Sequence, residues 1–256
     1  MKSFTDTSAS GSGFPPATRL YRGLLRALGP IVRGYSRVEL RGRENLPAGG
    51  AILVSNHPGS LWWDAVCLAA ALAPRPIAFV ANAWDFRNPL MGHLLHCVGA
   101  IPQADVVNRD DAAVDRARRG SLVCHFAEQA YHTFRRRYTV YRFAPQTLAY
   151  SRLAQVPVVP TAVVGVEEAA ATLAGFKRAG MPFHFPVVPP IVLPIKVIVE
   201  FGAPLSASEL TDNSTDDAFA GRAAARRLQD AVAALLAKQR RVRTSDEDYL
   251  QHAGWW

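Results

Sequence analysis

The sequence predicts one α/β domain with a mostly parallel central sheet flanked by helices. Short apolar runs rich in β-forming residues lie at 51–56, 76–81, 99–103, 122–128, 156–165 and 195–202. Helical patterns lie between them at 62–73, 88–97, 110–119 and 145–155. Strands that alternate with helices about 10–15 residues long are typical of a parallel sheet covered on both faces. The 256 residues suit one such domain with additional structure at one end.

The N-terminal end is expected to be a disordered segment followed by a helix. Residues 1–16 are polar and rich in Ser, Gly and Pro, without the apolar core of a secretory signal. In residues 17–36, apolar side chains recur at helical spacing, and arginines fall mostly between them. A basic amphipathic helix is typical of a membrane-surface element, and an ordinary helix packed on the core gives the same pattern. Both interpretations stay open at this point.

The domain is expected to span 17–243, with a polar tail at 244–256. Its last helix has acidic residues at 216–217 and basic residues at 238–241, as the helix dipole favours. Pro157 and Pro160 predict an irregular strand in 156–165, because proline lacks the N–H that a central strand donates. The Pro-rich stretch 182–194 predicts a loop.

The charge balance predicts an anionic partner. Lys plus Arg number 29 against 21 Asp plus Glu, a net charge of +8, which suits nucleic acid, a phosphorylated ligand or an acidic membrane. No nucleic-acid recognition motif is present, which disfavours the first. No run reaches the roughly 18 apolar residues of a spanning helix, so a peripheral place on the cytoplasmic face of a membrane is expected. The three cysteines lack metal-binding spacing, and neither a metal nor a bound cofactor is expected.

The segment SNHPGSLWWDA, residues 55–65, contains the main candidate for chemistry. His57 follows directly after an apolar strand, and ligands of open α/β sheets bind outside the carboxyl ends of strands. A histidine there acts as a general base on a hydroxyl when a carboxylate orients its other nitrogen, and Asp64 is the nearby carboxylate. The alternative is a turn histidine that precedes an ordinary helix.

This segment and three later ones resemble the lysophosphatidic acid acyltransferase family over roughly residues 38–240. The first family motif, Asn-His, four residues and Asp, corresponds to Asn56, His57 and Asp64. The second, a Gly-x-Ile approach to an arginine, corresponds to GAIPQADVVNR and Arg109. The third, Phe-Pro-Glu-Gly, is Phe-Ala-Glu-Gln at 126–129, and the fourth is Val-Pro-Val-Val-Pro at 156–160.

The resemblance implies an activity and roles for six residues. His57 is expected to be the catalytic base and Asp64 its orienting partner. Arg109 and Glu128 are expected to bind the acceptor, and the substrate-binding set also includes their motif neighbours Asn56 and Gln129. The implied donor is acyl-CoA or an acyl carrier protein thioester, and the acceptor a lysophospholipid such as 1-acylglycerol 3-phosphate. Without the resemblance, Arg109 reads as a surface partner of Asp110 or Asp111, and Glu128 as a strand-end ion pair.

Two departures from the family pattern affect these expectations. Six residues separate His57 from Asp64 instead of four, a rise of about 10 Å on a continuous helix, so the Pro-Gly-Ser stretch at 58–60 is predicted to bulge and bring Asp64 back. Gln129 replaces the glycine of the third motif. This favours a different acceptor, such as a neutral glyceride or a lyso-aminolipid. The lengthened His57–Asp64 spacing instead favours a catalytically weak lipid-binding relative. The arginines at 135–137 and 142 are either a solvated face or a contact for anionic lipid.

Overall fold

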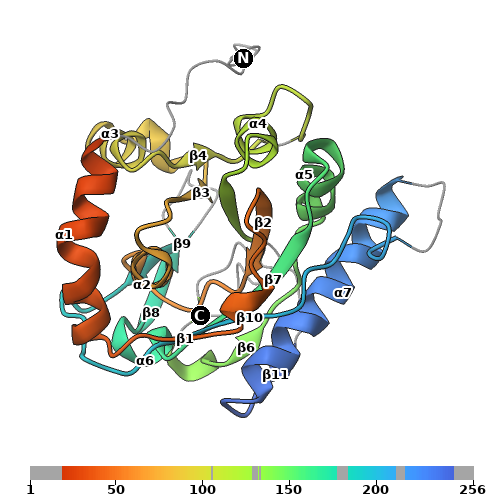
Figure 1. Ribbon diagram of the computed structural model, residues 1–256. Coiled ribbons are helices and arrows are strands. Elements are labelled where there is room, and N and C mark those ends of the chain that lie inside the picture. The colour runs from red at the N-terminus through yellow and green to blue at the C-terminus, as the bar shows by residue number, and fades with distance from the viewer. Residues whose placement is uncertain are drawn as a thin grey trace, which may run out of the picture.

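The computed structural model describes residues 19–104, 106–128, 132, 134–177, 184–211 and 217–244. They form an α/β body around a seven-stranded sheet (Figure 1). Its strands, in spatial order, are β1 (Glu39–Arg41), β10 (Ile198–Phe201), β7 (Val158–Val164), β2 (Ala51–Ser55), β5 (Leu122–Phe126), β3 (Ile77–Ala81) and β4 (Ile101–Pro102). The α-helices are α1 (Arg19–Tyr35), α2 (Trp63–Leu72), α3 (Pro89–Cys97), α4 (Ala112–Arg118), α5 (Gln146–Ala154), α6 (Val166–Ala169) and α7 (Asp217–Ala237).

The sheet is parallel from β7 through β2, β5 and β3 to β4. Only β10 runs antiparallel to its neighbour β7, and β1 lies parallel to β10. The predicted mostly parallel sheet is therefore confirmed. Three short 3-10 helices complete the body: η1 (Arg43–Asn45), η2 (Asp85–Arg87) and η3 (Phe134–Arg136).

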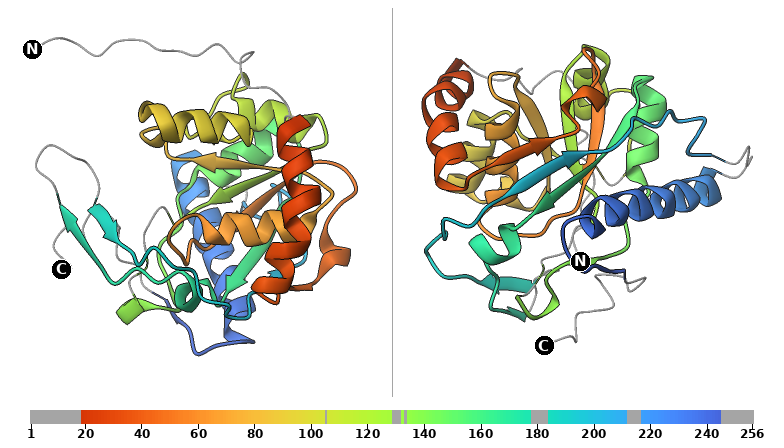
Figure 2. Two further views of the ribbon diagram at one scale, coloured as in Figure 1. Left: turned by 90° about the vertical axis from the view of Figure 1, so that its left-hand side faces the viewer. Right: turned by 60° about the horizontal axis from the view of Figure 1, so that its bottom comes forward.

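Helices cover both faces of the sheet (Figures 1 and 2). Along β2, Ile52 and Val54 belong to the core shared with α4, α5 and α7. Ala51 and Leu53 belong to the opposite core, shared with α1 and α2. Because successive side chains of a strand point to opposite faces, a strand between two helical layers is apolar at every position. This explains the unbroken apolar runs in the sequence.

β7 is a continuous strand in the interior of the sheet, and the irregularity predicted from its prolines is confined to its pairing with residues 202–205. Pro160 is accommodated by the neighbouring chain. Its carbonyl accepts from the Gly202 N–H at 2.8 Å, and Val158 exchanges two backbone hydrogen bonds with Leu205. The chain advances three residues from Gly202 to Leu205 while β7 advances only two, from Pro160 back to Val158, and this extra residue makes a β-bulge. Proline has no backbone N–H, and at this bulge the regular backbone pairing does not require one.

Two further strand pairs lie outside the main sheet. β8 (Ala174–Lys177) pairs antiparallel with β9 (His184–Val187), and this arm extends away from the body (Figure 2). The loop prediction for 182–194 is therefore wrong over β9. β6 (Thr139–Val140) pairs with β11 (Arg243–Thr244), so Thr244, predicted to begin the tail, is paired with Val140. Residues 1–16 and 245–256 lie outside the described ranges.

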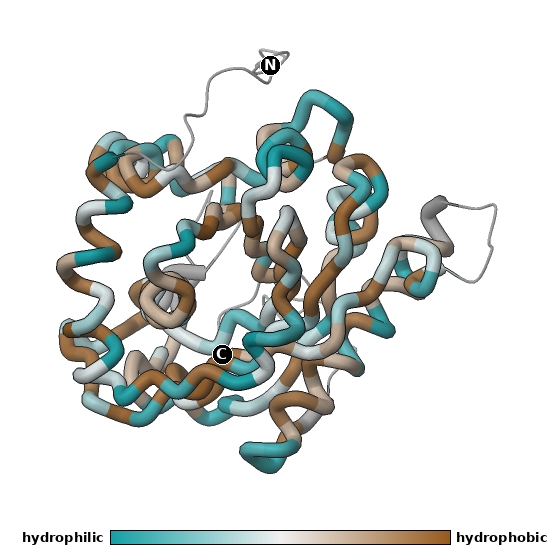
Figure 3. The backbone as a smooth tube through the Cα atoms, in the orientation of Figure 1, coloured by the Kyte–Doolittle hydropathy of each residue, from teal (hydrophilic) through white to brown (hydrophobic). Residues whose placement is uncertain are grey.

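Helix α1 has two different apolar faces. Tyr21, Leu25 and Gly29 are buried against the body. Four other apolar side chains are exposed and follow one another at helical spacing: Leu20, Leu24, Leu28 and Ile31. Figure 3 shows the resulting alternation of hydrophobic and hydrophilic positions along α1. Within the described ranges, no helix is long and apolar enough to cross a membrane.

Candidate active site

His57 is held at the carboxyl end of β2 by the residue before it. The Asn56 side chain donates through Nδ2 to the Val163 carbonyl and accepts through Oδ1 from the Val163 N–H, both at 2.9 Å. This pair of bonds continues the pairing of β2 with β7 beyond the last residue of β2. Asn56 is 2 % exposed, and both the nitrogen and the oxygen of its side-chain amide bond to protein backbone. Its geometry therefore supports the position of His57, and the role of Asn56 in substrate binding stays a prediction.

The predicted bulge between His57 and Asp64 is confirmed. Leu61 and Trp62 have left-handed φ angles of 59° and 52°, so the chain turns before α2 begins at Trp63. Ser60 anchors the turn, because its N–H donates to the Ala170 carbonyl at 3.1 Å and its hydroxyl bonds to that of Thr172. Asp64 consequently lies in the first turn of α2, where a helix dipole favours a carboxylate.

His57 and Asp64 form a hydrogen-bonded pair. Nδ1 of His57 lies 2.6 Å from Oδ2 of Asp64, whose side chain is fully buried. The other carboxylate oxygen accepts the N–H of Ala65 at 2.8 Å. Because a carboxylate only accepts, Nδ1 is the donor, and Nε2 of His57 is the ring nitrogen that takes a proton from a substrate.

Three carboxylates set the pKa of His57. Burial lowers the pKa, but the charge and hydrogen bond of Asp64, with the charges of Glu128 and Asp85, raise it above the ordinary value for histidine. These charges also stabilise the imidazolium that forms when His57 takes a proton. The arrangement is that of a general base.

Glu128 holds the main chain of His57. Its Oε2 accepts the His57 N–H at 2.8 Å and lies 2.9 Å from Nε2 of His132, and its Oε1 accepts the Tyr141 N–H at 2.7 Å. The carboxylate is fully buried, with each oxygen bonded to protein groups. It therefore fixes the segment that carries His57, and its contact with an acceptor stays a prediction.

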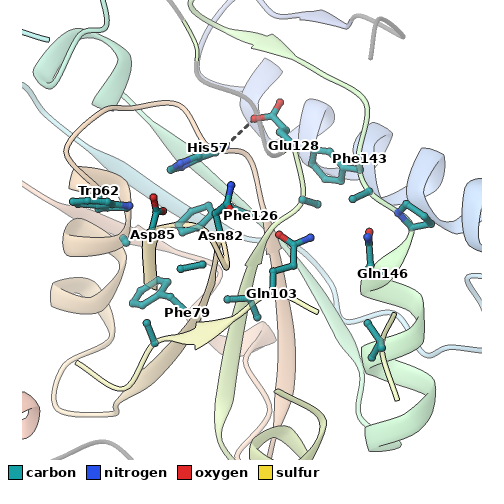
Figure 4. Close-up of a pocket in the computed structure, with 18 of the residues that line it drawn as sticks. His57, Trp62, Phe79, Asn82, Asp85, Gln103, Phe126, Glu128, Phe143 and Gln146 are labelled. Carbon is teal, nitrogen blue, oxygen red and sulfur yellow. Dashed lines mark hydrogen bonds between the residues drawn. The ribbon is translucent and has the colours of Figure 1, made fainter. Parts of the chain in front are cut away.

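His57 and Glu128 line a cavity of about 1880 Å³. Figure 4 shows His57 above an apolar wall that includes Trp62, Phe79 and Phe126. Exposed apolar side chains also line it, so its opening is partly apolar: Leu61, Val66, Leu94 and Val106. Its volume and apolar lining suit a lipid chain.

Sequence reasoning missed several residues of this cavity. Asp85, in the first turn after β3, points into it beside His57 (Figure 4). Burial raises the pKa of Asp85 above its ordinary value, and the charge of His57 offsets only part of this rise. Four arginines line the opposite side, on or near α5 and α7: Arg142, Arg152, Arg222 and Arg226. The place of Asp85 could have been predicted from the sequence. Polar residues that follow neighbouring parallel strands gather at one edge of the sheet, and Asp85 follows β3.

The two remaining predicted residues are not placed at the cavity. Arg109 is exposed in the turn before α4 and is not among the lining residues. Within the described ranges it forms no ion pair with Asp110 or Asp111 either, and its role as a phosphate ligand stays a prediction. Gln129 lies outside the described residues. In the same ranges, no three His, Cys, Asp or Glu side chains gather in a way that could hold a metal ion.

The chain has relatives among mycobacterial proteins. Uncharacterized proteins of Mycobacterium bovis and Mycobacterium tuberculosis are 28% identical over 241 residues, 83% of this chain and 64% of theirs. One of Mycobacterium leprae is 29% identical over 209 residues, 72% of this chain and 55% of its own. This chain thus spans less than two thirds of the length of these relatives.

The fold is also shared with a solved structure. The 1-acyl-sn-glycerophosphate (LPA) acyltransferase of Thermotoga maritima superposes with a TM-score of 0.55 at 16% identity, over 88% of this chain and 86% of that one. The model of the family described as Acyltransferase matches residues 37–164, which include His57, Asp64 and Glu128. With half of its length in this match, the chain belongs to the acyltransferase family.

Proposed function

We propose that this chain is an O-acyltransferase of glycerolipids. It moves a fatty acyl group from an acyl thioester, of coenzyme A or acyl carrier protein, to a lysophospholipid such as 1-acylglycerol 3-phosphate. The observation that carries the proposal is the 2.6 Å contact of His57 with buried Asp64 at the wall of a large, mostly apolar cavity. The Thermotoga protein that shares the fold is named for 1-acyl-sn-glycerophosphate, which supports this acceptor.

In the proposed reaction, His57 activates the acceptor hydroxyl. Nε2 of His57 takes the hydroxyl proton as the oxygen attacks the thioester carbonyl, and Asp64 stabilises the resulting imidazolium. The tetrahedral intermediate collapses by breaking the carbon–sulfur bond. The leaving thiolate takes the proton from His57, so the products are an ester and a free thiol. The base returns to its neutral form without any other reactant.

The experiment is thiol release from acyl-CoA in the presence of 1-acylglycerol 3-phosphate. His57→Ala should lower the rate about 100- to 10,000-fold, as expected for a lost general base. His93→Ala is the matched control, because His93 is exposed on α3 and outside the cavity lining. Unchanged circular dichroism and thermal unfolding separate lost chemistry from lost folding. Near-normal thiol release by folded His57→Ala protein would contradict the proposal.

A second acceptor class is favoured by one observation. Asp85 points into the cavity beside His57, where its charge repels an acceptor phosphate and attracts an amine. A neutral glyceride or a lyso-aminolipid therefore competes with 1-acylglycerol 3-phosphate as the acceptor. Comparing kcat/KM for the three acceptors decides between them. The alternative of a catalytically weak relative rested on the His57–Asp64 spacing, and the 2.6 Å contact removes that reason.

We also propose that the protein binds an anionic membrane surface through α1. The exposed apolar stripe of α1 runs beside exposed arginines such as Arg22 and Arg26. Apolar side chains that enter the lipid boundary and cations that meet its headgroups together give reversible binding. Co-sedimentation with vesicles should fall as salt rises and with loss of anionic lipid. Equal binding to neutral vesicles at every salt concentration would contradict the electrostatic part.

A further inference from the structure

A second histidine is connected to His57 through Glu128 and has no part in the reaction proposed above. His132 is 3 % exposed and is not among the residues that line the cavity. Its Nε2 lies 2.9 Å from Oε2 of Glu128. The same oxygen accepts the His57 N–H at 2.8 Å (Figure 4). One carboxylate oxygen therefore joins the ring of His132 to the main chain of the proposed base.

The two ring nitrogens of His132 have different surroundings. A carboxylate only accepts hydrogen bonds, so Nε2 donates to Glu128. Nδ1 is buried and has no hydrogen-bond partner among the described residues. Buried polar atoms are nearly always paired, and a leucine of similar size would leave no polar atom unpaired here. The hydrogen bond that Nε2 donates is therefore what distinguishes histidine from an apolar residue at this position.

Glu128 is held on two sides. Its Oε1 accepts the Tyr141 N–H at 2.7 Å, while Oε2 faces His132. The rings of His132 and Tyr141 also contact each other, with centroids 4.9 Å apart. Both oxygens of the carboxylate are thus fixed in direction. Without the donor of His132, Oε2 would lose one of the two hydrogen bonds that set its place relative to His57.

The position of His57 depends on such contacts. Its Nδ1 lies 2.6 Å from Oδ2 of Asp64. Asn56 ties the preceding residue to β7, and Glu128, which follows β5, holds the His57 N–H from the other neighbouring strand. A misplacement of about 1 Å in a catalytic constellation costs on the order of 100-fold in rate. A smaller shift of Oε2 is therefore enough for a measurable loss.

We propose that His132 is a positioning residue for His57 and acts through Glu128. Its Nε2–H fixes Oε2 where that oxygen accepts the His57 N–H, and this keeps Nδ1 of His57 at hydrogen-bonding distance from Asp64. Because His132 lies outside the cavity lining, the proposal gives it no contact with a substrate. The inference rests on the proposed function in taking His57 as the base, but the contact with Asp64 exists without substrate.

Three substitutions separate the hydrogen bond of His132 from its volume. The amide nitrogen of Gln is as many bonds from Cα as Nε2 of His, so His132→Gln keeps the donor. His132→Asn has the same amide on a shorter side chain that falls short of Glu128, and His132→Leu has no donor. In the thiol-release assay, kcat should fall about tenfold or more in His132→Asn and His132→Leu and stay near normal in His132→Gln. The KM values should not change, because the cavity lining is intact.

A buried histidine elsewhere provides the control. His125 is 1 % exposed, and its ring bonds to the Thr147 hydroxyl at 2.8 Å rather than to Glu128. His125→Leu should change the thermal unfolding but leave kcat normal. In Glu128→Gln protein, addition of His132→Leu should lower kcat no further, because both changes act on one contact and their effects do not add.

A measurement without substrate tests the geometry directly. The proton between His57 Nδ1 and Asp64 gives a proton NMR signal at low field when the contact shields it from exchange with water. This signal should persist in wild-type and His132→Gln protein and weaken or vanish in His132→Asn and His132→Leu protein. The comparison of His132→Gln with His132→Asn holds even where His132→Leu fails to fold.

Normal kcat and an unchanged NMR signal in folded His132→Asn protein overturn the inference and leave the proposed function standing. Equal losses of kcat in His132→Gln and His132→Asn also overturn it, since the ring rather than its hydrogen bond would then matter, and so does an equal loss in His125→Leu. Wild-type protein that transfers no acyl group, while the NMR signal follows the predicted order among the variants, refutes the proposed function and leaves the role of His132 standing.

Discussion

Replacing Gly59 by alanine tests whether the bulge at 58–62 brings His57 and Asp64 together. A Cβ on Gly59 would lie 3.3 Å from Val166 Cβ and overlap the Cγ1 methyl of the same residue. Carbon atoms in contact lie about 3.5–4.0 Å apart. Val166 is completely buried, so its side chain cannot turn out into solvent. The bulge must therefore move away from α6 by roughly 1 Å.

The expected magnitude follows from the length of the His57–Asp64 contact. At 2.6 Å between Nδ1 and Oδ2, an added 1 Å or so takes the pair beyond the roughly 3.2 Å limit of a good hydrogen bond. A misplacement of about 1 Å in a catalytic constellation costs on the order of 100-fold in rate. Overpacking a buried site costs about 1–3 kcal/mol of the free energy of unfolding. Gly59→Ala should show both losses.

A second substitution provides the control. Val166→Ala removes the methyl that Gly59→Ala meets, so the double variant should recover most of the lost kcat. Val166→Ala alone should lower stability by about 1–3 kcal/mol through the cavity it leaves, with a nearly normal kcat. The assay is thiol release from acyl-CoA, with urea unfolding of all three variants. Wild-type kcat in Gly59→Ala, or a double variant no better than Gly59→Ala while folded, would refute the reasoning.

Three other predictions concern the dyad, the pH profile and the membrane. Asp64→Asn keeps the shape of the side chain but removes the charge that orients His57. The value of kcat/KM should therefore fall about 100- to 10,000-fold, with an unchanged circular dichroism spectrum. A small loss of kcat/KM would show that Asp64 is not the partner of a catalytic His57. Asp85→Asn removes a charge that raises the pKa of His57, so the neutral base persists to lower pH and the acid limb of kcat/KM should shift downward. An unmoved limb would remove Asp85 from the site. Leu24→Ser/Leu28→Ser should weaken vesicle binding more than tenfold, because burial of each exposed leucine in lipid contributes about 1.5 kcal/mol or more. Unaltered co-sedimentation of this variant would show that α1 is not the membrane-binding element.

The sheet was largely predictable because its interior strands are apolar at nearly every position. The runs at 51–56, 76–81 and 122–128 contain β2, β3 and β5. The antiparallel direction of β10 had no sequence signal, since direction depends on how the chain returns to the sheet. The β8–β9 arm was missed because Pro186 argues against a strand, yet in a two-stranded arm each strand has an open edge that tolerates proline.

The site was predictable only where its residues lie close in the sequence. His57 and Asp64 are joined by a Pro-Gly turn, so their contact followed from local geometry. Asp85 and Glu128 follow β3 and β5, and the order of the strands brings them to the edge of the sheet where β2 ends. The arginines of α7 look like an ordinary solvated helix face in the sequence. Only the packing of α7 against α5 places them at the cavity.

The charges of the cavity are separated in a way that restricts how substrates fit. Asp64, Glu128 and Asp85 surround His57 with negative charge, which stabilises an imidazolium but repels phosphate. The arginines lie on the other side, along α5 and α7. The groups that react, a hydroxyl and a thioester carbonyl, are uncharged, and the phosphate of a thioester donor is remote from its carbonyl. The phosphate of 1-acylglycerol 3-phosphate, in contrast, is on the carbon next to the one that carries the reacting hydroxyl. The negative end therefore suits the two reacting groups and the phosphate-free acceptors, whereas a phosphorylated acceptor would bring its phosphate close to three carboxylates.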